Sequence, residues 1–279
     1  MTTQALSEQG RIARVLVATD GSEYSAGAIR TALAVAGHCG ASVTGMSVAL
    51  YNPEYSTLVP NLGEEAEKRA REALVSFTEA VGDGAQTLTV EAADPAQGIV
   101  EGTRQVDADV VVMGRRGKRG LARMMVGDAT AKVIGHADCA VLVCPRAARL
   151  WEKRILLATD GSAHSEAAAG TAGHLAKRFN LPVTVVSVIT SSHSAARRAE
   201  AEKAVNAKVE RMRAQGVTVE GLIEEGRPDE AIVKAAEDVG ADLIIMGSHG
   251  RTGLTKILLG SVAERVIGQA HCPVLVVKP

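Results

Sequence analysis

Three glycines and a serine near the end of the chain have the spacing of an anion-binding loop. Gly247 and Gly250 follow the apolar run DLIIM, and Gly260 and Ser261 precede the segment VAERVIG. Gly247 and Gly250 allow positive φ and carry no Cβ, so backbone N–H groups can converge on an anion. Gly260 permits close approach, and Ser261 can supply a hydroxyl and an N-cap where the helix N-terminus favours negative charge. The pattern predicts a phosphate-binding loop.

Other phosphate-binding motifs do not occur in the sequence. There is no GxxxxGK followed by Ser or Thr, and no GxGxxG after a strand-like run, so the Walker A and dinucleotide-binding classes are excluded. A lone GxxG is more often a pair of turn or C-cap glycines. The full spacing, with nine residues between Gly250 and Gly260 directly after an apolar run, is far more specific.

Asp160 is a second candidate ligand group, because it directly follows the apolar run RILLAT. A carboxylate at the end of a parallel strand lies at the edge of the sheet where ligands bind, and it can accept two hydroxyl protons from a ribose. The same side chain could instead cap the next helix, with Gly161 and Ser162 forming the turn, and the two roles are compatible. Within the loop, Arg251 beside His249 could either face phosphates or be solvated.

Both features occur in an internal repeat. RVLVATDGS at 14–22 matches RILLATDGS at 154–162, and the segment 107–143 matches 240–276. The offset falls from 140 to 133 between these two blocks, so seven extra residues of the first copy lie around 49–65. The chain therefore contains two copies of one domain.

Each copy alternates short apolar runs with longer amphipathic segments. In the second copy we expect strands at 154–159, 182–189, 218–223, 242–246 and 273–277, and helices at 162–179, 195–215 and from Pro228 onward. Strands that are apolar on both faces and alternate with helices specify a mostly parallel sheet covered on both sides. The predicted fold is α/β, with two tandem doubly wound parallel-sheet domains, 1–148 and 149–279, of five strands each.

These motifs resemble the universal stress protein (UspA) superfamily in its tandem form, and in particular the nucleotide-binding branch, whose pattern is GxxGx9G followed by Ser or Thr. The resemblance extends to ATDGS in each copy, to GRPDEAIV and to PVLVVKP. It implies an adenine nucleotide alpha hydrolase-like fold and an ATP, AMP or ADP site, with or without Mg²⁺. Asp160 would contact the ribose, the backbone around Val188 the adenine, and the glycine loop the phosphates. The implied site residues are Ala158, Asp160, Val188, Gly247, His249, Gly250, Arg251, Gly260, Ser261 and Val262.

The first copy departs from the pattern at Asp128, which stands where Ser or Thr is expected. A carboxylate a few Å from a phosphate costs about 4 kcal/mol per charge pair at an effective dielectric near 20, and about 1 kcal/mol in water. Asp is itself a good N-cap, so the helix start survives while the anion site suffers. Nearby basic residues could offset this cost or pair with Asp128: Arg115, Arg116, Lys118, Arg119 and Arg123. We expect poor or no nucleotide binding in the first copy, at Asp20, Val48, Gly114, Gly117 and Gly127.

Composition excludes several other functions. The 31 basic and 32 acidic residues give a net charge of −1, so nothing global indicates a nucleic-acid or membrane partner. No apolar stretch approaches the roughly 18 residues that cross a bilayer, and residues 1–10 lack the features of a signal peptide, so we expect a cytoplasmic protein. The cysteines contain no CxxC pair and are expected to be buried hydrophobes: Cys39, Cys139, Cys144 and Cys272.

The resemblance implies a stress-response sensor or regulator whose state depends on ATP. Three alternatives remain open at this stage: a slow ATPase, a thiol-based redox-responsive scaffold without nucleotide, and a flavin-binding electron carrier, which the 2% aromatic content disfavours. The runs AVLVC and PVLVV are typical of edge strands. The resemblance implies that such strands pair antiparallel between domains, which within one chain would form a pseudo-dimer, and the unit could form a homodimer.

Overall fold

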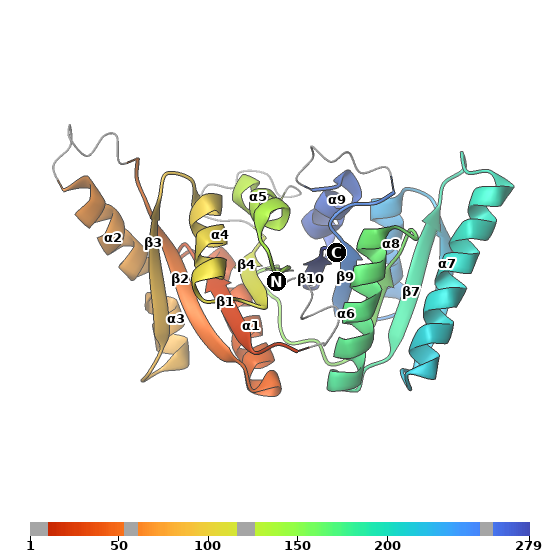
Figure 1. Ribbon diagram of the computed structural model, residues 1–279, viewed down its shortest axis with the longest axis horizontal. Coiled ribbons are helices and arrows are strands. Elements are labelled where there is room, and N and C mark those ends of the chain that lie inside the picture. Colours follow the sequence, from red (N-terminus) through yellow and green to blue (C-terminus); the bar gives the residue numbers. More distant parts are fainter. Residues whose placement is uncertain (1–10, 53–60, 116–125, 252–258) are drawn as a thin grey trace.

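The structure is a computed structural model that describes residues 11–52, 61–115, 126–251 and 259–279. Ten strands form one continuous sheet in the order β3-β2-β1-β4-β5-β10-β9-β6-β7-β8 (Figure 1). All neighbouring strands are parallel except β5 and β10, which are antiparallel. The sheet therefore consists of two doubly wound five-stranded halves joined edge to edge, which confirms the predicted fold class.

The first half contains β1 (Arg14–Ala18), the short 3-10 helix η2 (Glu23–Ser25), α1 (Ala26–Cys39), β2 (Ser42–Leu50), α2 (Leu62–Ala73), α3 (Val75–Val81), β3 (Gln86–Ala92), α4 (Pro95–Gln105), β4 (Val110–Gly114), α5 (Asp128–His136) and β5 (Ala140–Cys144). The second half contains β6 (Ile155–Ala158), α6 (Ala163–Phe179), β7 (Val183–Ile189), α7 (Ala195–Ala214), β8 (Val219–Glu225), α8 (Pro228–Asp238), β9 (Leu243–Gly247), α9 (Ser261–Gln269) and β10 (Val274–Val277). The expected strands and helices of the second half match these bounds to within two residues.

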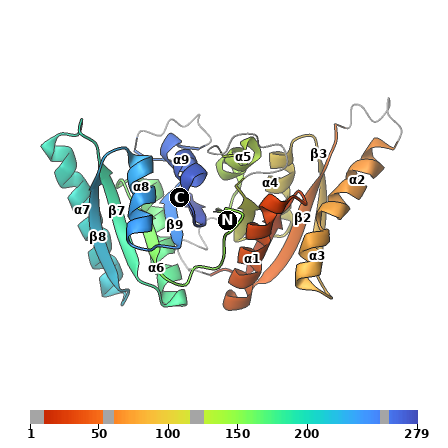
Figure 2. The same cartoon turned by 180° about the vertical axis from the view of Figure 1, so that it is seen from behind.

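Helices cover both faces of the sheet because its central strands are apolar on both faces. Every residue of β4, β5, β9 and β10 is buried. One hydrophobic cluster includes residues of α1, α3, α6 and α7, and a second includes residues of α4, α5, α8 and α9. Figures 1 and 2 show the two halves as a pair with α5 and α9 adjacent near the centre. This layering places the carboxyl ends of the parallel strands of each half at one edge.

The final strand of each half lies at the centre of the molecule. Val141, Leu142 and Val143 of β5 pair antiparallel with Val276, Leu275 and Val274 of β10. The pairing that the family resemblance implies between domains therefore occurs within one chain. The predicted boundary at 148/149 falls in the connection between Cys144 and Ile155, where Trp151 is 2% exposed.

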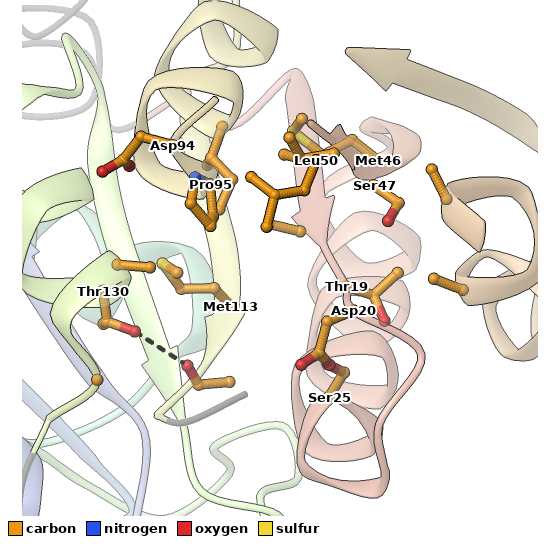
Figure 3. A pocket seen from close by; sticks show the side chains of 18 of the residues that line it. Thr19, Asp20, Ser25, Met46, Ser47, Leu50, Asp94, Pro95, Met113 and Thr130 are labelled. Atoms are coloured by element: carbon orange, nitrogen blue, oxygen red, sulfur yellow. Dashed lines mark hydrogen bonds between the residues drawn. The ribbon is translucent and has the colours of Figure 1, made fainter. Parts of the chain in front are cut away.

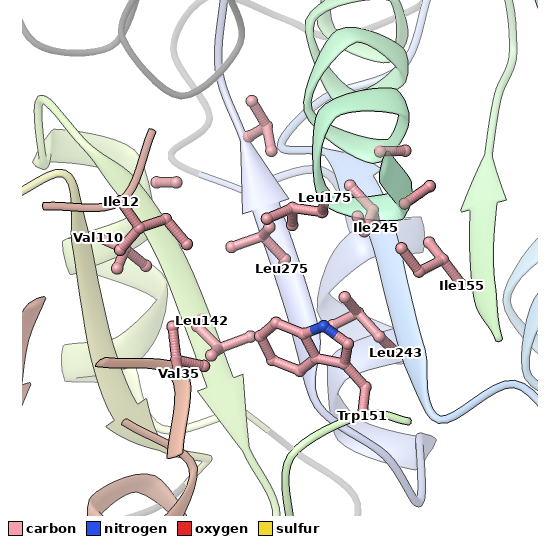
Figure 4. Close-up of a cluster of buried hydrophobic side chains, with 14 of the residues drawn as sticks. Ile12, Val35, Val110, Leu142, Trp151, Ile155, Leu175, Leu243, Ile245 and Leu275 are labelled. Carbon is pink, nitrogen blue, oxygen red and sulfur yellow. The ribbon is translucent and has the colours of Figure 1, made fainter. Parts of the chain in front are cut away.

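Side chains from each half also bind the helix ends of the other half. Arg115 Nη1 donates to three carbonyls at the end of α9, at 3.3, 2.8 and 3.2 Å, namely those of Ile267, Gly268 and Ala270. Reciprocally, Lys278 Nζ donates to the carbonyl oxygens of Gly135 and Ala137 at the end of α5. Trp151 and Leu142 lie together in the apolar cluster between the halves (Figure 4).

Candidate functional site

A cavity of about 660 Å³ lies at the carboxyl ends of β6, β7 and β9. This second cavity is lined by all ten residues that were proposed for the second copy from the sequence. They come from four separate segments of the chain: Ala158, Asp160, Val188, Gly247, His249, Gly250, Arg251, Gly260, Ser261 and Val262. These residues lie in separate segments of the chain, and the doubly wound topology places those segments at one edge of the sheet.

Asp160 connects the end of β6 to the glycine loop. Its Oδ1 accepts a hydrogen bond from the N–H of Ser162 at 3.0 Å, and its Oδ2 accepts one from the N–H of Arg251 at 2.7 Å. Ser162 is the N-cap of α6, since its Oγ accepts from the N–H of Ser165 at 3.2 Å. The turn uses Gly161 at φ +78°, as predicted. Asp160 therefore organises the turn before α6 and also faces the cavity.

The loop glycines are needed for close packing and not for a positive φ, which neither Gly247 nor Gly250 has. A Cβ on Gly247 would lie 2.6 Å from the Cβ of His164 at the start of α6. A Cβ on Gly250 would lie 2.8 Å from Asp160 Oδ2. Side chains at these positions would push the loop away from β6, so glycine holds the loop against the sheet edge.

The N-terminus of α9 lines the second cavity with backbone donors. Gly260 occupies the N-cap position in an extended conformation, and Ser261 is the first helical residue, so the prediction of Ser261 as N-cap is wrong. Gly260 has no side chain that could accept a hydrogen bond from this helix end. The first N–H groups of a helix have no intrahelical acceptor and favour an anion. This end of α9 can therefore bind phosphate oxygens.

The main chain of Val188 is oriented for recognition of a planar polar ligand. The β6–β7 pairing ends at Ala158 and Val186, whereas β7 continues to Ile189. The Val186 carbonyl accepts from the N–H of Thr159, and main-chain groups alternate sides along a strand, so Val188 presents its N–H and C=O on the same side, beyond the end of β6. A donor and an acceptor so placed match the edge of an adenine ring.

Two histidines and a buried serine lie beside the loop. Ser248 Oγ is 3.1 Å from Nδ1 of both His164 and His249, and the two ring centroids are 5.2 Å apart. Burial, followed by the nearby imidazole of His249, lowers the pKa of His164. This environment therefore favours the neutral form of the His164 imidazole.

Sequence reasoning missed the contribution of α7 to the second cavity. His193, just before this helix, and Arg197 and Glu200 in its first turns all line the cavity. The helix itself was expected, but periodicity identifies only its buried face. How its N-terminus lies relative to the glycine loop depends on tertiary packing, so the sequence contained no signal for these residues.

A matching cavity of about 580 Å³, the first cavity, lies at the carboxyl ends of β1, β2 and β4. Four of the first-copy residues line it, namely Asp20, Val48, Gly114 and Gly127, whereas Gly117 lies outside the described residues. Figure 3 shows Asp20 and Ser25 on one side of this cavity and Thr130 on the other. Both halves therefore have a cavity at the equivalent sheet edge.

Asp128 differs from expectation in its position and its partner. It is the first residue of α5, with Gly127 as N-cap, so the prediction of Asp128 as N-cap is wrong. Its side chain is 82% exposed and pairs at 2.9 Å with Lys132, which also pairs at 2.9 Å with Asp94. Among the basic residues expected near Asp128, Arg115 binds the end of α9, and Arg116, Lys118, Arg119 and Arg123 lie outside the described residues.

The four cysteines are poor nucleophiles in this structure. Burial raises the pKa of Cys139, Cys144 and Cys272 to about 12 each. Burial also raises the pKa of Cys39, and the nearby Arg178 only partly offsets it. Because the thiolate is the reactive species, this environment disfavours thiol chemistry.

Within the described residues, no cluster of three or more His, Cys, Asp or Glu side chains could hold a metal ion. Among the same residues, no helix combines the length and the apolar character needed to cross a bilayer.

The fold is that of a tandem α/β protein with a cavity at the equivalent sheet edge of each half. The model of the Universal stress protein family matches residues 11–145 and 152–278. The chain belongs to this family.

Relatives match part of the chain or nearly all of it. A universal stress protein of Methanocaldococcus jannaschii is 44% identical over 140 residues, covering 45% of this chain and 82% of the relative. One from Mycolicibacterium smegmatis is 28% identical over 302 aligned residues, covering 99% of both. The crystal structure of a universal stress protein from Archaeoglobus fulgidus has a TM-score of 0.74 at 23% identity and covers 95% of this chain and 96% of that one, which supports the tandem fold.

Proposed function

We propose that this universal stress protein binds an adenine nucleotide (ATP, ADP or AMP), with the second cavity as the principal site. One observation carries the proposal: the ten residues that the family resemblance implies, from four segments of the chain, line a single cavity at the carboxyl edge of the sheet. Cavities of this size, with apolar walls and a few convergent polar groups, are typical small-molecule sites.

Polar groups of the second cavity would contact three parts of the nucleotide: the adenine, the ribose and the phosphates. The N–H and C=O of Val188 would bind the adenine edge, with Ile232 and Met246 as apolar walls. Asp160 would accept hydrogen bonds from the ribose hydroxyls, because each carboxylate oxygen can accept more than the one N–H it now receives. The phosphates would meet the start of α9 and the loop at 247–251. Mg²⁺, where present, would neutralise part of the phosphate charge.

We infer a sensor or regulator role for the bound nucleotide. The ligand would join β6, β7, the glycine loop and α9, so its binding would stabilise the arrangement of the second half. The sequence contains no P-loop lysine, so we expect any ATP hydrolysis to be slow. The thiol-based alternative is disfavoured by the raised cysteine pKa values.

Two substitutions test the proposal, and each introduces the residue found at the equivalent position of the other half: Ser261→Asp and Asp128→Ser. Ser261→Asp puts a carboxylate at the start of α9 without disturbing the helix, because Asp128 opens α5. We expect it to weaken ATP binding about fivefold to nearly a thousandfold, since a charge repulsion costs about 1 to 4 kcal/mol. Gly260→Glu is a poorer choice, because a Cβ there would lie 3.1 Å from the carbonyl oxygen of Ser248.

Isothermal titration of ATP into the wild-type chain and Ser261→Asp measures this effect, with Asp128→Ser as the reciprocal variant. Asp128→Ser should leave the second-cavity affinity unchanged and strengthen binding in the first cavity. Chromatography of the nucleotide released on denaturation would identify the natural ligand. Two equal ATP sites per wild-type chain, or an unchanged affinity in Ser261→Asp, would contradict the assignment of the second cavity as the principal site.

A further inference from the structure

One carboxylate at the rim of the second cavity holds two arginines. Glu200 Oε2 is 2.8 Å from Arg251 Nη1 and 3.2 Å from Arg197 Nη1. All three residues line the second cavity. Arg251 belongs to the glycine loop and Arg197 to the first turn of α7, so Glu200 joins the two sides of the cavity mouth.

The main chain of Arg251 is held independently of this ion pair. Its N–H donates to Asp160 Oδ2 at 2.7 Å, and the neighbouring Gly250 packs against the same carboxylate. The guanidinium can therefore change partner without displacement of the loop. The loop that would bind phosphates thus presents an arginine that is already engaged with an internal anion.

The ion pairs at the rim are weak enough to be exchanged. The side chains of Glu200, Arg251 and Arg197 are 55%, 43% and 25% exposed. Exposed pairs of this kind contribute little free energy because water screens them. Each arginine makes one contact with Glu200 Oε2, whereas a phosphate group carries more charge and can bind a guanidinium bidentately, so it is a strong competitor for both arginines.

We propose that Glu200 acts as an internal competitor for the phosphate tail and so sets the preference of the second cavity for nucleotides with more or fewer phosphates. This inference rests on the proposed nucleotide site. A triphosphate that reaches Arg251 and Arg197 must replace Glu200, whereas a nucleoside bound at Val188 and Asp160 leaves the pair intact. Glu200 therefore lowers the affinity for long phosphate tails and leaves nucleoside affinity unchanged.

The test compares Glu200→Gln with Glu202→Gln by calorimetric titration of ATP, AMP and adenosine. Both substitutions remove one negative charge from an exposed position on α7, but residues two apart do not share a helix face. We expect Glu200→Gln to bind ATP about fivefold more tightly than the wild-type chain does, the equivalent of one screened charge pair. Adenosine affinity should stay constant, and Glu202→Gln should behave as the wild type does.

The outcomes separate the two proposals. A wild-type chain that binds neither ATP nor inorganic tripolyphosphate contradicts the proposed nucleotide site. A wild-type chain that binds ATP, together with a Glu200→Gln variant that binds ATP no more tightly, overturns only the role of Glu200. An equal gain in adenosine and ATP affinity, or an equal gain in Glu202→Gln, overturns it as well.

Discussion

Gly250 has no Cβ, and this lets the glycine loop lie close to Asp160. In Gly250→Ala the added Cβ would lie 2.8 Å from Asp160 Oδ2, so either this carboxylate or the loop must shift, which disturbs the hydrogen bond from Arg251. Because misplacement of binding groups by about 1 Å costs on the order of a hundredfold in enzymes, we expect ATP affinity to fall at least tenfold. Titration measures this, with thermal unfolding as the control for folding. Unchanged affinity would show that the loop position does not matter.

His164 should make the stability of the protein depend on pH. Its pKa is lowered in the folded state by burial and by His249, and Asp160 only partly opposes this. As the pH falls below about 6.5, the unfolded chain takes up the proton first, so the free energy of unfolding decreases until the folded-state pKa is passed.

In His164→Asn this part of the pH dependence is removed, while the amide can still contact Ser248. Urea unfolding at about pH 7 and about pH 5 should therefore show a smaller loss of stability for His164→Asn than for the wild-type chain. An equal loss in the two proteins would mean that His164 does not contribute.

At the scale of single elements, α1 is fitted closely to the connection between the halves. A Cβ on Gly27 would lie 2.1 Å from the carbonyl oxygen of Pro145, which is backbone and cannot turn aside. Gly27→Ala should therefore lower the free energy of unfolding by about 1 to 3 kcal/mol. Gly37→Ala in the same helix has nothing within 4 Å of the new Cβ and should stabilise by about 0.5 to 1 kcal/mol. Denaturant unfolding of both variants checks this, and equal effects would contradict the packing argument.

Periodicity predicted the elements well because local apolar patterns specify them, but it failed where a polar group is buried by pairing. Lys208 lies on the buried side of α7, only 3% exposed, because its ammonium reaches Glu166 of α6. Asp229 was expected in the first turn of α8, where it lies, but it is 1% exposed and bound by Arg227 and Gln269. Glu166 and Gln269 belong to other helices, so no local pattern shows these two partners.

The candidate site was predictable where the repeat supplied a motif. The second-cavity residues of the glycine loop and Asp160 follow strands directly, so strand order alone places them at one edge. Arg197 and Glu200 lie on a helix whose approach to the loop depends on packing. The partner of Asp128 was also missed, although Lys132 lies one helical turn later on α5, a spacing that favours an ion pair.

At the scale of the whole molecule, reciprocal contacts join the two halves. Arg115 and Lys278 each bind the end of a helix in the other half, and burial lowers the pKa of Lys278. Hydrogen bonds from charged groups contribute about 1.5 to 3 kcal/mol each, so Arg115→Ala combined with Lys278→Ala should destabilise the protein by about 3 kcal/mol.

The fluorescence of Trp151, the one tryptophan of the sequence, reports directly on this junction during unfolding. The double variant should lose the buried-tryptophan signal at lower urea concentration than the wild-type chain. Arg104→Ala removes an exposed ion pair with Asp138 and should change the stability by less than about 1 kcal/mol. Coincident curves for all three proteins would contradict a joining role.

The homodimer implied by the family resemblance stays a prediction, which the molar mass in solution tests.

A crystal structure of the full chain grown with ATP tests the central claim most directly. We expect density for the nucleotide in the second cavity, with adenine at Val188, ribose at Asp160 and the phosphates against the N–H groups at the start of α9. An empty second cavity at saturating ATP, or ATP bound only elsewhere on the chain, would contradict it.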